Sequence, residues 1–565
     1  MTDIKLRLRS IKNKFTTKHG LLGDYNYKYL FTPEIPFITK KDSTTKHLQP
    51  FFGLNSDMPV VLGFVLGLQH ALSMLAGVVT PPIIISSAAQ LSAQESSYLV
   101  SAALITSGLL SLIQITRFKI PYTNYYIGSG LLSVLGTSFA TISIVNNAFP
   151  LMYQDGTCKY DADGNKMACP EGYGALLGTA CVTSLLEIAL SFMPASTLQK
   201  LFPPIVTGPV VLLIGISLIQ SGFEDWLGGS GCMSIAACPS VGGPMAAPWG
   251  SARFIGLGFL VFVTIVFCEK WGSPIMKSTA VIVGLLVGCI VAAAAGYFEH
   301  SSIDSAPVGT FLWVHTFKLS IYGPAVLPFL ATYIVLMMEA IGDMSATSDV
   351  SRLPIYGPEF DSRIQGGILN DGIAGCLSCL MTITPMSTFA QNNGVISMTK
   401  CANRMAGYWC CAILIIMGIF GKFSGAILSI PKPVLGGMTT FLFTSVCAAS
   451  LSIISRCKFT RRDRFVLTCS LVFGLGATMV SDWFSFVFTY DGDNKALKGF
   501  YSAIVLVCET GYAIGGIVGV IMNLIIPEED ITDEHLDVLE GTSTGPEEDS
   551  TNVEAYGLDD VSKKF

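Results

Sequence analysis

Residues 384–394 read Thr384-Pro385-Met386-Ser387-Thr388-Phe389-Ala390-Gln391-Asn392-Asn393-Gly394. This segment lies in a strongly apolar part of the chain, yet it is too polar for a helix that faces lipid, and Pro385 and Gly394 bracket it. Polar, broken backbone at membrane depth is tolerated only where it is buried in protein or lines a cavity. A matching segment, residues 128–140, is rich in glycine and serine. Two interrupted segments at corresponding positions predict a binding site at the centre of a membrane-embedded fold.

Composition also places the chain in a membrane. Hydrophobic residues make up 51% of the 565 residues and charged residues only 13%, whereas a soluble domain carries about 25% charged residues. Residues 1–50 are basic and polar without an early apolar core, so we expect no cleavable signal peptide. The acidic stretch after Pro527 is expected to be a solvated, disordered tail. Neither charged end predicts nucleic-acid binding.

Apolar runs predict about fourteen membrane-spanning segments, several of them broken by proline or glycine, because about 20 apolar residues cross a bilayer as a helix. They begin near residues 58, 97, 124, 174, 205, 252, 279, 325, 366, 387, 405, 433, 465 and 501. Lysine and arginine favour alternate connections, which predicts an even number of spans with both termini in the cytosol. The same topology places Cys158 with Cys169, and Cys232 with Cys238, in outer loops where disulfides are possible.

Three short pairings predict an internal repeat. Thr137-Ser138-Phe139-Ala140 resembles Ser387-Thr388-Phe389-Ala390, Gln69-His70-Ala71 resembles Met338-Glu339-Ala340, and Pro204-Ile205-Val206-Thr207-Gly208 resembles Pro433-Val434-Leu435-Gly436-Gly437. The paired segments occur in the same order in both halves. Since seven spans per half is an odd number, the halves would enter the membrane from opposite sides, as in the inverted repeats of secondary transporters. Two unrelated sets of small-residue helices are the alternative.

Polar and ionisable side chains within predicted spans are costly and are therefore candidates for function. In chain order they are Gln69, His70, Glu187, Glu339, Asp343, Asp371, Asp482 and Glu509. Glu339 and Asp343 end the eighth predicted span one helical turn apart, and Asp371 opens the ninth. Glu187 and Glu509 are better explained as structural or boundary residues. Gln69 and His70 are equally well explained as hydrogen-bond partners between helices.

The side chains of these segments favour a flat heterocycle as the ligand. Glu339 offers a carboxylate acceptor, and Gln391 offers an amide that both donates and accepts hydrogen bonds. Phe139 and Phe389 could cover the two faces of such a ring, or they could be ordinary packing aromatics. No basic residue occurs in the two interrupted segments, which disfavours a strongly anionic ligand. A carboxyl group at membrane depth with few cations nearby favours its protonated form, which makes Glu339 or Asp343 a candidate proton carrier.

Residues 391–400, Gln391-Asn392-Asn393-Gly394-Val395-Ile396-Ser397-Met398-Thr399-Lys400, resemble the signature of the nucleobase–ascorbate transporter family, also called the nucleobase–cation symporter-2 family. The family form of this signature is Gln/Glu/Pro-Asn-x-Gly-x-x-x-x-Thr-Arg/Lys/Gly. Gln69-His70 resembles the first-helix motif of the family, and Glu339-Ala340-Ile341-Gly342-Asp343 resembles its eighth-helix motif. Asp24-Tyr25-Asn26-Tyr27 resembles a cytosolic trafficking motif. The resemblance covers residues 20–525 and is close to the fungal uric acid–xanthine permeases.

The resemblance implies an all-α polytopic fold, built as a seven-plus-seven inverted repeat with two short broken segments near residues 135–140 and 386–391. It implies a core domain, a gate domain, an obligate homodimer in the plasma membrane and elevator-like movement of the core. The implied parts are a cytosolic N-terminal segment (1–56), core segments (57–200 and 301–422), gate segments (201–300 and 423–526) and an acidic cytosolic tail (527–565).

The resemblance also implies roles for individual residues. Glu339 and Gln391 would bind the substrate, with main-chain contacts near Phe139 and Ala390 and with Phe139 stacked on the ligand. The implied substrate-binding set is Glu339, Gln391, Phe139, Ala390, Phe389 and Ser138. Asp343, Asp371, Gln69 and His70 would support the site and proton coupling, with His70 also supporting folding and traffic. Asn392, Gly394, Thr399 and Lys400 would tune specificity and transport. No catalytic residue, metal or cofactor is implied, and the coupling ion would be the proton.

The sequence therefore predicts proton-coupled uptake of an oxidised purine, xanthine or uric acid, by alternating access. Gln391 favours these purines because relatives that carry uracil or ascorbate often have Glu or Pro at this position. Lys400 stands where close fungal relatives often carry arginine, and lysine lacks the planar fork of arginine, so the preference between xanthine and uric acid stays open. The alternatives are a symporter for another nucleobase such as uracil, or an anion carrier of the same fold. A channel or an enzyme has little support, since the sequence contains no repeated filter, metal-ligand cluster or nucleophile paired with a base.

Overall fold

The computed structural model describes residues 16–23, 25, 27–33, 51–162, 164–229, 247–298, 300–355, 357–455, 457–480, 483–488 and 495–527. Several sequence predictions therefore lie outside the described residues. These are the pair Cys232 and Cys238, the position of Asp482, the acidic tail after Pro527 and part of the predicted trafficking motif.

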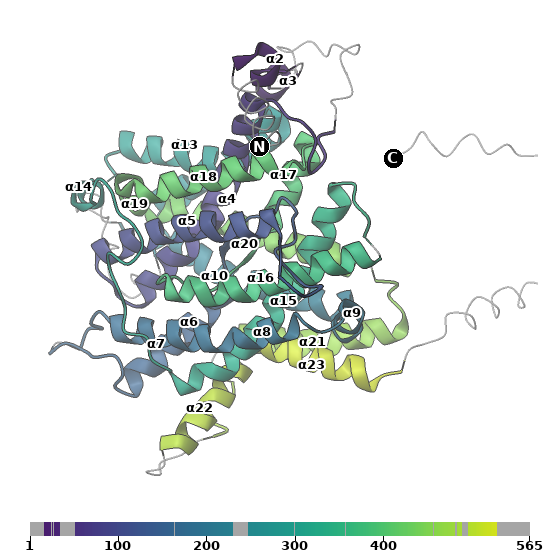
Figure 1. The fold of residues 1–565 in the computed structure, drawn as a ribbon. Helices are drawn as coiled ribbons and strands as arrows, with labels where there is room; N and C mark the ends of the chain where they lie inside the picture. Colours follow the sequence, from purple (N-terminus) through teal and green to yellow (C-terminus); the bar gives the residue numbers. More distant parts are fainter. Residues whose placement is uncertain are drawn as a thin grey trace, which may run out of the picture.

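The described chain is predominantly helical, with most of its long helices running side by side (Figure 1). The first half contains α4 (Val60–Ala88), α5 (Ala93–Thr116), α6 (Ala140–Gln154), α7 (Pro170–Thr183), α8 (Leu185–Leu190), α10 (Pro204–Trp226), α11 (Ala252–Trp271) and α13 (Ala280–Ala294). The second half contains α15 (Val326–Val350), α16 (Pro358–Leu380), α17 (Gln391–Thr399), α18 (Arg404–Ile419), α19 (Gly421–Leu428), α20 (Lys432–Ile454), α21 (Arg461–Met479), α22 (Lys495–Glu509) and α23 (Gly511–Ile525). Shorter helices are α2 (Lys18–Leu21), α3 (Tyr27–Phe31), α9 (Ala195–Leu201), α12 (Pro274–Ser278), α14 (Ser301–Ser305) and the 3₁₀ turn η2 (Gly323–Ala325).

The membrane segments follow the predicted order but differ in length. Among the described residues, seven helices are long and apolar enough to span a membrane, or up to nine if each of two bent pairs counts as one span. The bent pairs are α18 with α19, at 79°, and α22 with α23, at 84°; α22 projects from the helical body in Figure 1. The other predicted spans are the shorter α13, the more polar α16 and α21, and two half-length helices, α6 and α17.

Two helix boundaries differ from the sequence prediction, and a third agrees with it. α15 continues to Val350, so Glu339 and Asp343 lie inside the helix and not at its end. α16 begins at Pro358, which places Asp371 within the helix, and Glu509 lies at the break between α22 and α23. Charged residues end an apolar run in the sequence, but a helix can continue past them where protein, and not lipid, surrounds the side chain.

Two pairs of short strands add to the all-α architecture that the sequence predicted. β1 (Phe118–Lys119) pairs with β2 (Tyr126–Ile127), and β3 (Leu135–Thr137) pairs antiparallel with β4 (Met386–Thr388). Leu135 lies opposite Thr388 and Gly136 opposite Ser387, and every residue of β3 and β4 is buried. The two interrupted segments thus satisfy each other's backbone groups, which would otherwise be costly to bury.

The strand pair confirms the inverted repeat and the two predicted broken segments. β3 leads directly into the half-length helix α6, and β4 leads into the half-length helix α17. Since the strands are antiparallel, the two strand–helix units enter the centre from opposite directions. In each half, two long helices precede this unit, as α4 and α5 do in the first half and α15 and α16 in the second.

A disulfide closes the connection between α6 and α7. Cys158 and Cys169 are bonded, with a sequence separation of 11 residues. Both side chains are buried, although they lie in a polar part of the chain. This confirms one of the two disulfides that the sequence allowed.

We expect Cys158→Ser to destabilise the protein by about 3 kcal/mol, because the open loop increases the entropy of the unfolded chain. Thermal unfolding in detergent, with and without dithiothreitol, measures the change. Reduction should lower the unfolding temperature of the wild type and leave that of the variant unchanged. Cys469→Ser, which removes a free thiol, is the control. An equal effect of reduction on the wild type and on Cys158→Ser would contradict the expectation.

Candidate binding site

The paired strands place two phenylalanines against each other at the centre of the protein. The Ser138 N–H donates to the Pro385 carbonyl (2.9 Å), and the Phe389 N–H donates to the Val134 carbonyl (3.1 Å). These bonds extend the β3–β4 ladder by one residue on each side. The Phe139 and Phe389 rings that follow are stacked, with centroids 5.7 Å apart and planes inclined by 12°.

A third ring comes from α20. Phe443 meets the Phe139 ring edge-on, with centroids 5.6 Å apart and planes at 88°. Such pairs add about 0.5–1.5 kcal/mol beyond the burial of their surface. Phe139 is therefore held by one ring from its own strand pair and by another from a distant helix.

Asp371 anchors β4 from α16. Its carboxyl group is fully buried and accepts a hydrogen bond from the Ser387 hydroxyl (2.8 Å) and another from the Thr388 N–H (3.1 Å). Hydrogen bonds to a charged group are stronger than neutral ones. Asp371 thus fixes the position of the strand that carries Phe389.

Glu339 and Gln391 approach this centre from two helices. α15, which carries Glu339, packs against α6, α17 and β4. Gln391 is the first residue of α17. Both side chains are partly exposed, and within the described part of the chain neither forms a hydrogen bond or ion pair. Their polar groups are therefore available to a ligand.

Unpartnered polar atoms surround the strand pair. The hydroxyls of Ser138 and Thr141 are buried, and neither has a hydrogen-bond partner among the residues that the structure describes. The buried Thr388 hydroxyl faces the Asp343 carboxyl group. The first N–H groups of α6 and α17 also have no intrahelical acceptor, and the helix dipole makes these two ends positive. Buried polar groups are normally hydrogen-bonded, so their concentration here fits a site that a polar ligand completes.

The structure separates the neighbours Gln69 and His70. His70 Nδ1 lies 3.2 Å from Asn392 Oδ1, and the Asn392 amide lies 3.4 Å from the Phe389 carbonyl. Gln69 instead donates to the Ser278 hydroxyl and the Pro274 carbonyl of α12. His70 therefore supports the start of α17, whereas Gln69 connects α4 to α12.

The remaining signature residues lie farther along α17. Gly394 is exposed and has open space where a Cβ would point. The Thr399 hydroxyl donates to the Val395 carbonyl of its own helix. Lys400 ends the helix in the left-handed conformation (φ 54°), and its carbonyl accepts from the Phe52 N–H. Ala390, the N-cap residue of α17, lies next to Phe389 at the strand pair.

Several residues next to the site were not predicted to belong to it. Glu187 was interpreted as structural, yet its fully buried carboxyl group neighbours that of Asp371. Tyr512 donates to the Ala140 carbonyl at the start of α6 and contacts the Thr332 hydroxyl. Glu187 could have been found from the sequence, because it is an acidic residue within an apolar run. The sequence contains no comparable signal for Tyr512 or Phe443. Glu509 accepts a hydrogen bond from Ser485, which agrees with a boundary role.

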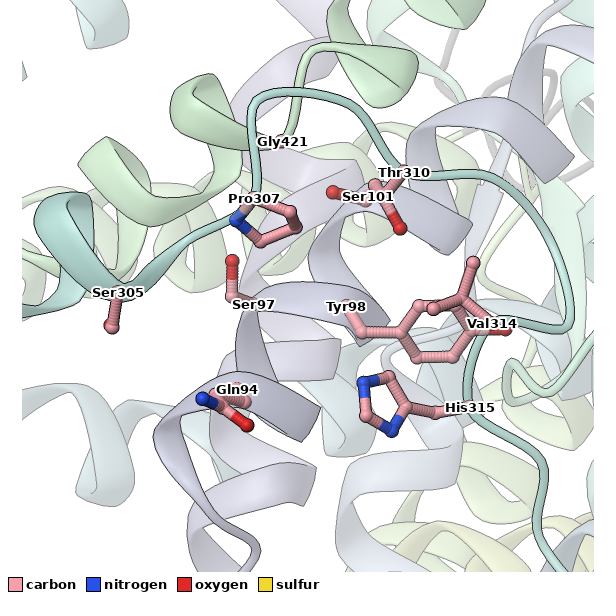
Figure 2. A pocket seen from close by; sticks show the side chains of 10 residues that line it. All are labelled: Gln94, Ser97, Tyr98, Ser101, Ser305, Pro307, Thr310, Val314, His315 and Gly421. Carbon is pink, nitrogen blue, oxygen red and sulfur yellow. The ribbon is translucent and has the colours of Figure 1, made fainter.

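A separate cavity of about 290 Å³ lies between α5, the connection after α14 and the start of α19 (Figure 2). The Tyr98 and His315 rings lie side by side in its wall, with centroids 5.2 Å apart. The Tyr98 hydroxyl is already paired with Thr382 and with the Trp313 N–H. None of the predicted site residues lines this cavity.

The chain is similar to known permeases over most of its length. The Xan_ur_permease family, described as a permease family, matches residues 63–483. A purine permease of Emericella nidulans is 57% identical over 549 residues, which cover 95% of this chain and 94% of the relative. A uric acid-xanthine permease of the same organism is 56% identical over 527 residues, covering 93% of this chain and 91% of the relative.

The fold also has a solved counterpart. The structure of SLC26A9 matches with a TM-score of 0.50 and 12% sequence identity, covering 73% of this chain and 62% of that one. At this identity the likeness concerns the arrangement of helices alone.

We expect Ser387→Ala to destabilise the protein by about 1.5–3 kcal/mol, because the buried Asp371 carboxyl group loses the hydrogen bond from the Ser387 hydroxyl. Thermal unfolding of the purified protein measures the change. Ser445→Ala is the matched control, since that hydroxyl only returns a hydrogen bond to the Leu442 carbonyl of its own helix. Equal unfolding temperatures for the two variants would show that Asp371 does not depend on Ser387.

Proposed function

Because the chain belongs to the nucleobase–ascorbate transporter family of permeases, we propose that it carries an oxidised purine, xanthine or uric acid, into the cell together with a proton. The chain is a multi-pass membrane protein, and its relatives are permeases and not enzymes. The two similar fungal proteins are named for purines and for uric acid and xanthine, which supports this substrate class.

The observation that carries the substrate proposal is the set of unpartnered polar groups around a stacked aromatic pair. An oxidised purine is flat and has both ring N–H groups and carbonyl oxygens. Its N–H groups would donate to Glu339 and to the Gln391 amide oxygen, and its carbonyls would accept from the free N–H groups at the starts of α6 and α17. The Phe139 ring would cover one face of the purine.

Binding requires the phenylalanine stack to open. Phe139 and Phe389 now cover each other, with their centroids 5.7 Å apart. Two glycines leave the space that the Phe389 ring occupies. A Cβ on Gly136 would come within 3.0 Å of three atoms of this ring, and a Cβ on Gly77 would come within 2.7 Å of one of its atoms. We infer that the purine replaces Phe389 against Phe139, and that Phe389 turns away as the ligand enters.

The proton would bind within a group of carboxyl side chains. Glu339, Asp343 and Asp371 are close enough to interact electrostatically. Within the described ranges, none of them forms an ion pair with lysine or arginine. Like charges this close in a protein interior cannot all remain ionised at little cost, so the group favours taking up a proton. This arrangement supports proton symport.

The helix contacts support a division into core (57–200 and 301–422) and gate (201–300 and 423–526). α10 packs along α20, and α11 packs with α13 and α20, all within the proposed gate. α5 packs on α18 and α4, and α15 on α16, all within the proposed core. Phe139 and Phe443 meet across the boundary. We propose that the core moves past the gate in the manner of an elevator, carrying the site across the membrane.

We propose that the gate helices also form a homodimer in the plasma membrane, with both termini in the cytosol. α11 is the least enclosed of the seven spanning helices, with 28% of its apolar window buried. Phe259, Val263 and Val266 are exposed on it. This surface must contact either lipid or a second copy of the chain.

Uptake of radiolabelled xanthine in cells without purine permeases of their own tests the proposal. We expect saturable uptake that a protonophore abolishes and that unlabelled uric acid inhibits. Inhibition by uracil alone would favour the nucleobase alternative, and transport of sulfate would favour the anion carrier. Absence of saturable uptake of oxidised purines would refute the proposed substrate class.

We expect Glu339→Ala and Gln391→Ala each to weaken xanthine uptake by about 10- to 100-fold, because each removes hydrogen bonds to a desolvated ligand. Initial uptake rates over a range of xanthine concentrations measure the change, and surface labelling shows whether the variant reaches the membrane. Gln220→Ala, which alters an exposed glutamine of α10, is the control. Wild-type kinetics in either variant would remove that residue from the site.

A further inference from the structure

Glu187 is a buried acid to which none of the described residues donates a hydrogen bond. It lies in α8, which continues α7 after a short turn at Ser184, and its side chain is 0% exposed. Among the described residues, no N–H or hydroxyl group donates to either carboxyl oxygen, and the Asp371 carboxyl group lies within hydrogen-bonding reach. In the part of the chain that the structure describes, Glu187 forms no ion pair. A buried carboxylate in this condition is too costly to persist, so the group must carry a proton or share one.

The groups around Glu187 are acids or neutral side chains. α8 packs against α16, α15 and α7. The titratable groups that these helices place near Glu187 or Asp371 are Asp371, Cys376 and Cys379 from α16, Tyr333, Glu339 and Asp343 from α15, and Cys181 from α7. The buried Tyr333 hydroxyl also has no hydrogen-bond partner among the described residues, and the Cys181 and Cys376 sulfurs lie 3.4 Å apart. A cation that could balance a charged Glu187 is absent from this described set.

The hydrogen bonds that Asp371 and Glu187 receive indicate that the proton lies on Glu187. Asp371 accepts from the Ser387 hydroxyl and from the Thr388 N–H, so it is satisfied as a carboxylate. Within the described part of the chain no group donates to Glu187, but the Asp371 carboxylate beside it can accept one more hydrogen bond. A small residue at Gly372 allows this approach, since a Cβ there would lie 2.9 Å from the Ile188 nitrogen. The two carboxyl groups then share one proton, as adjacent acids in a dry site do.

This pair is connected to the binding site in two ways. Asp371 holds β4, which pairs with β3 and positions Phe139 and Phe389. Asp371 also interacts with Glu339, whose side chain is partly exposed. The carboxyl groups of Glu339, Asp371 and Glu187 therefore form a series that leads from the accessible site into the protein interior.

We propose that Glu187 is the binding site of the transported proton, an inference that rests on the proposed symport of a purine. A proton taken up at Glu339 passes to Asp371 and then to Glu187, so that an O–H bond breaks at each donor as another forms at the next oxygen. With the proton bound, Glu187 donates to Asp371 and Asp371 keeps β4 in place. When the proton leaves, two adjacent carboxylates repel each other, the hold on β4 weakens and the purine is released.

Reconstituted protein in vesicles with an imposed proton gradient tests the proposal. Glu187→Gln keeps a hydrogen-bond donor for Asp371 but cannot release a proton. We expect the wild type to accumulate xanthine up to about tenfold for a gradient of one pH unit, since one proton per purine conveys that free energy. We expect E187Q to exchange xanthine across the membrane but to equilibrate it without accumulation. Glu171→Gln, the same change at an exposed position of α7, should accumulate xanthine like the wild type.

Accumulation by E187Q at the wild-type level would overturn the proposal. If the wild type carries no purine at all, the proposed function fails, and this result is distinct from the failure of Glu187 alone. If E187Q does not fold, infrared difference spectra with and without xanthine decide between the outcomes. The C=O stretching band of a protonated carboxyl group should then shift in Glu187→Asp, and an identical band in wild type and E187D would refute the assignment.

Discussion

Backbone hydrogen bonds between β3 and β4 satisfy the N–H and C=O groups of the two interrupted segments. Lipid could not satisfy these groups, and a continuous helix does not include them. Each unpaired N–H or C=O group at membrane depth costs several kcal/mol, and each interrupted segment by itself would leave such groups unpaired. Pairing them antiparallel removes the cost and joins the two halves of the repeat at one point. The same pairing brings the starts of α6 and α17 together, so the free N–H groups and positive ends of both helices converge on Phe139 and Phe389.

The second constraint is electrostatic. Glu187, Glu339, Asp343 and Asp371 lie in the same region without an ion-pair partner among the described residues. If these four acids had only a structural role, apolar side chains in their place would make the protein more stable, because buried charges are costly even when they are paired. Asp371 connects this acidic group to the strand pair through Ser387 and Thr388. Proton occupancy and the geometry of the purine site thus depend on the same carboxyl group.

The site lies where two sets of helices meet. Phe139 belongs to the strand–helix unit of the first half, and Phe443 belongs to α20, which packs with α10 and α11. A ligand that separates Phe139 from Phe389 would also alter the contact with Phe443. The aromatic group is therefore placed to couple ligand binding to the relative position of the two helix sets.

The sequence by itself determined the positions of the membrane segments, the two breaks, the inverted order and the family. These features are local, because hydrophobicity and helix-breaking residues act along the chain. Only the tertiary structure decided that Gln69 contacts α12 while His70 contacts Asn392, and that α15 continues past Glu339 and Asp343. It also brought Glu187 beside Asp371, across a long stretch of sequence. Such contacts depend on which helix faces pack together, and whether protein or lipid surrounds a charged residue cannot be read from its neighbours in the sequence.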